Sequence, residues 1–125
     1  MPATLADVRR IALSLPETRE APCYGRPGFY VQKKIFACLR EDGETLAVTY
    51  PKTERDELID RHPDVFFYTD HYVKYDWVVL NLFAISSDLL RDTLADAWRL
   101  RAGKKLVAAS LTPPQIKKAS SKKNP

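Results

Sequence analysis

Between residues 28 and 50 the chain carries short alternating apolar and polar segments joined by tight turns, and this pattern constrains the fold more than any other feature. The pattern predicts three strands, at about 28–32, 34–40 and 45–50. In the middle segment, one face holds Ile35, Ala37 and Leu39 and the other holds Phe36, Cys38 and Arg40. Asp42 and Gly43 form a pair that favours a tight hairpin turn, so we expect antiparallel neighbours.

Three amphipathic segments predict helices around these strands. Thr4 and Asp7 have the spacing of a capping box at the start of the first helix, and Pro16 ends it. Its apolar stripe is Leu5, Val8, Ile11, Ala12 and Leu15. Thr53 is the expected N-cap of a second helix that Pro63 closes. Ser86 or Ser87 is the expected N-cap of a third, which Gly103 ends.

The remaining segments complete a two-layer α+β fold. Two further strands are expected at about 65–69 and 75–83, and the proline-rich residues 16–28 are expected to form a loop. The order α-β-β-β-α-β-β-α predicts a five-stranded antiparallel sheet with the first and third helices packed on it. Both tryptophans, Trp77 and Trp98, are expected to be buried.

Charge and composition divide the chain at its C-terminal end. With 125 residues and 45% apolar residues, the chain suits a single domain, which we place at residues 1–109. The net charge is +4, yet residues 1–103 carry 14 basic and 16 acidic side chains, because six lysines follow Gly103. Residues 110–125, rich in Lys, Pro and Ser, are expected to be a disordered tail. Two interpretations of this tail stay open: a solubilising end, which is the commoner case, or an arm that adds non-specific, salt-sensitive affinity for phosphates. Without an apolar run long enough for a membrane span or a signal peptide, we expect a cytoplasmic protein.

The segment "DHYVKYDW", residues 70–77, is dense in aromatic and charged residues. Alternation predicts that Val73, Tyr75, Trp77 and Val79 face the core and that Tyr72, Lys74 and Asp76 face away from it. Two interpretations of His71, at the entrance of this strand, stay open: a neutral imidazole bonded to the backbone, or a phosphate contact.

No catalytic, metal or cofactor pattern is found in the sequence. Cys23 and Cys38 have no defined spacing to His62 or His71, and in a reducing compartment they are expected to be free thiols. We expect Cys38 to be buried and Cys23 to be partly exposed. We therefore expect a protein that is not an enzyme and needs no cofactor or metal.

Several landmarks in a fixed order resemble the MmcQ/YjbR family of small bacterial proteins, over about residues 5–107. These are Leu15-Pro16, Tyr24-Gly25, the strand "KIFACL", and His71 followed by Trp77. The resemblance implies a fold similar to secretion-chaperone-like domains. It also implies DNA binding through a double wing, in which two β-hairpins project from the domain.

Candidate contacts to DNA phosphates follow from where cations and aromatic residues lie near these hairpins. They are Lys33, Lys34, Lys74, His71 and Tyr72, bordered by Tyr24 and Arg26. Two other functions stay open: a protein-interaction module, and a small-ligand binder or enzyme built on the loop 20–28 with Cys23, which would need a concave pocket. The sequence does not define the oligomeric state.

Overall fold

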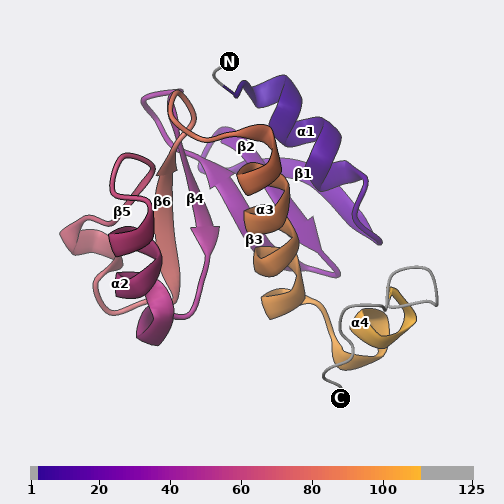
Figure 1. The fold of residues 1–125 in the computed structure, drawn as a ribbon. Coiled ribbons are helices and arrows are strands. Elements are labelled where there is room, and N and C mark those ends of the chain that lie inside the picture. Colours follow the sequence, from indigo (N-terminus) through magenta and orange to yellow (C-terminus); the bar gives the residue numbers. More distant parts are fainter. Residues whose placement is uncertain (1–2, 111–125) are drawn as a thin grey trace.

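The structure, a computed structural model, describes residues 3–110 and is built on one antiparallel sheet (Figure 1). The strands are β1 (Thr18–Cys23), β2 (Arg26–Val31), β3 (Lys34–Leu39), β4 (Thr45–Thr49), β5 (Phe66–Phe67) and β6 (Trp77–Asn81), in the sheet order β1-β2-β3-β4-β6-β5. The helices are α1 (Leu5–Leu13), α2 (Lys52–Arg61), α3 (Ser87–Arg101), α4 (Lys104–Ser110) and the short 3-10 helix η1 (Asp70–Tyr72). The α+β class and the antiparallel pairing are therefore confirmed, but the sheet has six strands where five were predicted.

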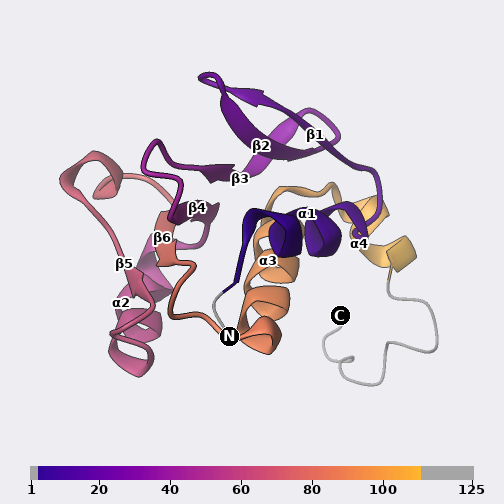
Figure 2. The ribbon, with the colours of Figure 1, turned by 90° about the horizontal axis from the view of Figure 1, so that it is seen from above.

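The hydrophobic core lies between the sheet and the helices α1 and α3, which share one side of it (Figure 2). Its largest members without exposed surface are Val8, Phe29, Val31, Phe36, Leu46, Val48, Val78, Leu80, Leu90 and Leu94. Helix α2 packs instead against β5 and β6. Within residues 3–110, none of the helices has the length and apolar content that crossing a membrane requires.

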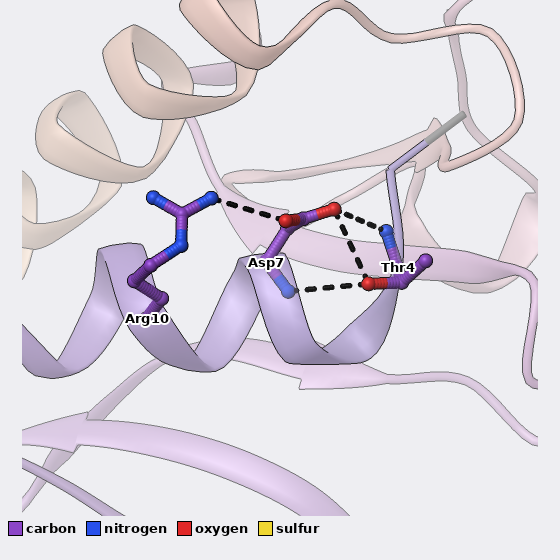
Figure 3. Close-up of polar contacts among 3 residues, drawn as sticks. All are labelled: Thr4, Asp7 and Arg10. Atoms are coloured by element: carbon purple, nitrogen blue, oxygen red, sulfur yellow. Dashed lines mark hydrogen bonds and ion pairs between the residues drawn. The ribbon is translucent and has the colours of Figure 1, made fainter. Parts of the chain in front are cut away.

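The predicted capping box at the start of α1 is confirmed (Figure 3). The Asp7 amide donates to Thr4 Oγ1 at 3.3 Å, and the Thr4 amide donates to Asp7 Oδ2 at 2.9 Å. Arg10 donates to the other oxygen of the same carboxylate at 3.0 Å. The hydrogen bond from the Thr4 amide is the main reason that the pKa of Asp7 lies below its ordinary value.

The sixth strand, β1, lies in the region that was predicted to be a loop. A two-residue turn joins β1 to β2, and both of its residues have positive φ, 53° at Tyr24 and 81° at Gly25, as in a type I′ hairpin turn. Pro22 lies opposite Pro27. Counted from the turn, this is a pair that does not exchange backbone hydrogen bonds, so neither proline removes one from the β1–β2 ladder. β1 is also an edge strand, where proline is tolerated.

A bulge breaks the alternation that was predicted for the middle strand. The register between β2 and β3 shifts between Phe29 and Tyr30. As a result, the consecutive residues Phe36 and Ala37 both belong to the core, with no exposed surface on either. Beyond the bulge, Cys38 lies on the opposite face from Ala37 and Leu39.

The last strand is shorter than the predicted range 75–83, and residues 70–76 lie outside it. They form η1 and an irregular segment, and β6 begins only at Trp77. Val73 and Tyr75, predicted to be buried, are 45% and 56% exposed. Trp98 is buried as predicted, at 2% exposure, but Trp77 is only half-buried.

The helices differ from the expectations at the start of α2 and in the presence of α4, whereas the cap of α3 is confirmed. α2 begins after Pro51, not after Thr53, and its Lys52 amide donates to the Asp76 carboxylate at 3.0 Å. The cap thus comes from the segment before β6, which lies far away in the sequence. Ser86 caps α3 as predicted, by accepting from the Leu89 amide at 3.1 Å. α4 was not predicted, and it includes Ser110, the first residue of the expected tail. Residues 111–125 of that expected tail lie outside the described part.

Replacing a core ring should destabilise the fold far more than replacing an exposed one. Phe36→Ala should lower the free energy of unfolding by about 3–5 kcal/mol, because it empties a fully buried position. The matched control is Phe83→Ala at a ring that is 58% exposed, with an expected change within about 0.5 kcal/mol. Urea denaturation measures both values, and equal losses would contradict the position of the core.

Candidate functional site

A cleft opens on the face of the sheet away from α1 and α3, and we call it the outer-face cleft. The core under those helices includes Ala37 and Leu39 of β3 and Leu46 and Val48 of β4. Alternation places the intervening residue Cys38, and its paired neighbour Ala47, on the opposite face. In Figure 2, the turn between β1 and β2 and the segment before β6 both project on that side of the sheet.

The outer-face cleft has two adjoining parts of similar size. The cationic part has a volume of about 300 Å³ and is lined by Arg26, Cys38, Arg40, Glu41, His71 and Tyr72. The aromatic part has a volume of about 290 Å³ and is lined by Cys23, Tyr24, Arg26, Ile35, Cys38, Ala47, His71, Tyr72, Tyr75 and Trp77. The two parts share Arg26, Cys38, His71 and Tyr72 and therefore form one continuous surface.

A buried arginine holds one side of this cleft in place. Arg55 of α2 is 4% exposed, and its guanidinium donates to four backbone carbonyls in the segment before and at the start of β6. Nη1 donates to the carbonyls of Tyr72, Tyr75 and Trp77 at 3.0, 3.1 and 2.8 Å, and Nη2 donates to that of Val73 at 3.2 Å. The guanidinium also lies 3.8 Å from the centre of the Tyr68 ring, a cation–π contact. Arg55 therefore fixes the backbone that carries the cleft's rings.

Four rings on that side pack against one another. His71 and Tyr72 meet edge to face with their centres 4.8 Å apart, and Tyr72 lies 6.4 Å from Trp77. The ring of Tyr75 lies 6.4 Å from that of His71. These distances are typical of favourable aromatic pairs, so the rings reinforce the wall that Arg55 anchors.

The β1–β2 hairpin supplies the other side. Arg26 Nε donates to the Leu39 carbonyl at 3.1 Å, which joins the start of β2 to the end of β3. Tyr24 stands at the hairpin turn and is 90% exposed. An arginine thus lies at the base of this hairpin and an exposed ring at its tip.

The two thiols meet on the floor of the cleft, because a glycine separates their strands. A Cβ at Gly28 would lie only 2.8 Å from Cys23 Cβ, and Gly28 is paired with Cys38 on the next strand. Burial raises the pKa of Cys38 to about 12, and a hydrogen bond with Cys23 adds to the rise. Both cysteines are free; Cys38 is buried and Cys23 half-buried, as predicted.

The structure divides the residues that the sequence had grouped as phosphate contacts. It brings Tyr24, Arg26, His71 and Tyr72 together in the cleft. Lys33 and Lys34 are exposed but lie at the far end of β2, roughly 17 Å from Arg26 by strand rise, so the structure does not bring them into the cleft with His71 and Tyr72. Their turn lies instead beside the start of α4, where the Gly103 amide donates to Gln32 Oε1 at 3.2 Å. Lys74 is exposed and does not line the cleft.

Several cleft residues were missed from the sequence. Arg40 directly precedes the acidic residues of the β3–β4 turn, and Tyr75 and Trp77 were assigned to a buried face. Arg55 lies in the charged segment "TERDELID", which reads as a solvated helix surface. Only its contacts with a segment about twenty residues later distinguish it. Within the described residues, no three histidine, cysteine or acidic side chains are grouped as metal ligands would be.

Comparison with known proteins places this fold in a family. The YjbR family model matches residues 13–100. The chain belongs to the YjbR family. Among solved structures, the YjbR chain is similar to the Deinococcus radiodurans protein DR2400, a DUF419 domain protein, with a TM-score of 0.67 and 21% identity over 92% of this chain and 86% of that one. At this identity the likeness shows a shared fold, and no curated protein matches the chain.

The two thiols should react at very different rates in the folded protein. At about pH 8, iodoacetamide should label Cys23 and leave Cys38 unlabelled, because Cys38 is buried and its pKa of about 12 keeps it protonated. In urea both should be labelled, and Cys23→Ser should leave no rapid labelling in the folded state. Mass spectrometry follows the adducts; equal rates at both thiols would contradict the arrangement of the cleft floor.

Proposed function

We propose that this chain binds DNA and that the outer-face cleft is the surface that contacts it. DNA is the ligand that the family resemblance implies. The observation that carries the proposal is the gathering of two guanidinium groups and an imidazole with exposed rings in one cleft. Guanidinium groups bind phosphate oxygens with two parallel hydrogen bonds, and aromatic rings stack on bases.

The position of the arginines supports a contact that uses two hairpins. Arg26 begins β2 in the β1–β2 hairpin, and Arg40 follows β3 in the β3–β4 hairpin. Both line the cationic part, and the bond from Arg26 to the Leu39 carbonyl holds the hairpins together there. Two hairpins that carry one cation each at a shared cleft suit the double wing that the resemblance implies.

The acidic β3–β4 turn is less of an obstacle than its sequence suggests. The Asp42 carboxylate faces its own turn, where it accepts from the amides of Glu44 and Thr45 at 2.8 and 2.9 Å. Glu41, however, lines the cationic part. With few cations and one carboxylate at the site, the proposed binding is weak and strongly dependent on salt, and the lysines of the tail add affinity that does not depend on the cleft.

A small-molecule ligand is the second candidate function, favoured by the concavity of the site. Each part of the cleft has a volume of about 300 Å³, at the lower end of the range for pockets that hold small ligands. Such a ligand would have to be anionic and planar to match the same side chains. DNA contains both of these features, so we place it first.

Removing the two cleft arginines should weaken DNA binding by the full-length chain. Arg26→Ala combined with Arg40→Ala should flatten the slope of log K against log salt by about 1.4–1.8, since each lost phosphate contact removes about 0.7–0.9. The charge-matched control is Arg10→Ala with Arg91→Ala, two exposed arginines that pair with acids on α1 and α3. Anisotropy titrations with labelled DNA at several salt concentrations measure both, after circular dichroism has established that the variants fold.

The variant Lys33→Ala with Lys34→Ala tests the contact that the sequence suggested. If this variant or the control loses as much slope as the cleft variant, the cleft is not the DNA surface. If the wild type loses all binding when the lysines at 117, 118, 122 and 123 are replaced by serine, the folded domain does not bind DNA. A protein partner, the alternative that the sequence left open, then becomes the leading function.

A further inference from the structure

The rim of the aromatic part carries two exposed tyrosine rings. Tyr24 is 90% exposed and Tyr75 is 56% exposed. Tyr24 also adopts a φ of 53°, a conformation that glycine or asparagine occupies at lower cost. An exposed tyrosine in an unfavourable conformation adds little to stability, so its position at the mouth of a cleft points to a ligand contact.

The two rings belong to opposite sides of the cleft. Tyr24 is at the tip of the β1–β2 hairpin, whereas Tyr75 belongs to the segment that Arg55 fixes through the Tyr75 carbonyl at 3.1 Å. Between these sides the floor carries small side chains, because Cys38 and Ala47 are paired neighbours on β3 and β4. A flat ring can therefore enter between the rims and lie over the floor.

Size limits what can occupy this space. The aromatic part has a volume of about 290 Å³, which suits one base and not a stack of base pairs. In duplex DNA each base is paired and stacked, so it can enter a pocket of this size only after it has left the helix, which costs a few kcal/mol per base. A base in single-stranded DNA is already unpaired, so it can enter the pocket without the cost of breaking a base pair.

We infer that the outer-face cleft selects unpaired nucleotides of single-stranded DNA. The base occupies the aromatic part and stacks on Tyr24 and Tyr75. The phosphate occupies the adjoining cationic part, where Arg26 and Arg40 bind it. This inference rests on the proposed DNA binding and adds to it the form of DNA that the cleft accepts.

The test compares the full-length chain on a labelled single-stranded oligonucleotide and on the duplex of the same sequence. Single-stranded DNA should bind more tightly. Tyr24→Ala should weaken that binding by about tenfold, since a stacked base is lost, and should leave duplex binding nearly unchanged. Tyr24→Phe keeps the ring and should bind as the wild type does, and Phe83→Ala is the control for an exposed ring elsewhere.

A second oligonucleotide isolates the role of the base. A strand in which abasic sites replace the nucleotides keeps the phosphates, and it should bind the wild type about as weakly as the intact strand binds Tyr24→Ala. If the duplex binds better and Tyr24→Ala changes nothing, the inference fails although DNA binding stands. If neither form of DNA binds, the proposed function itself fails, and the inference fails with it.

Discussion

A single buried guanidinium organises one half of the candidate site. Arg55 lies almost fully inside the protein, and within residues 3–110 no acidic side chain forms an ion pair with it. Its charge is balanced by four carbonyl dipoles from the segment 72–77 and by the ring of Tyr68. A buried charge without partners costs several kcal/mol, so helix and segment stabilise each other only in this arrangement. In turn, the Asp76 carboxylate of this segment accepts a hydrogen bond from the Lys52 amide at the start of α2 and so caps that helix.

The other half of the site depends on the absence of side chains. Gly28 leaves room for Cys23 beside it, and the small residues Cys38 and Ala47 continue the floor toward the centre of the sheet. A larger residue at Gly28 would meet Cys23 Cβ at 2.8 Å and would force the hairpin away. The cleft therefore exists because an anchored segment and a hairpin rise on either side of a low floor.

The sequence predicted those parts of the fold that depend on local patterns. The capping box at Thr4, the cap at Ser86, the strands β2 to β4 and the burial of Trp98 all follow from short-range periodicity or from residue type. β1 was predicted to be a loop because of its prolines, and only the pairing of Pro22 with Pro27 on β2 shows why a strand tolerates them. The cleft was predicted only in part, at Tyr24, Arg26, His71 and Tyr72, because contacts distant in sequence build it. Arg55 has the same local pattern as an exposed helix residue, and only the carbonyls around it reveal its role.

Amide hydrogen exchange in the segment 70–77 tests the role of Arg55 most directly. The variant Arg55→Lys keeps the charge but cannot donate to four carbonyls, and the matched control Arg61→Lys alters an exposed arginine on the same helix. In Arg55→Lys, the hydrogen-bonded amides of Tyr72, Val73 and Tyr75 should exchange about tenfold faster or more, while the amides of β3 and β4 keep their protection. Unchanged protection in this segment, or an equal loss throughout the sheet, would contradict the conclusion that Arg55 holds the wall of the cleft.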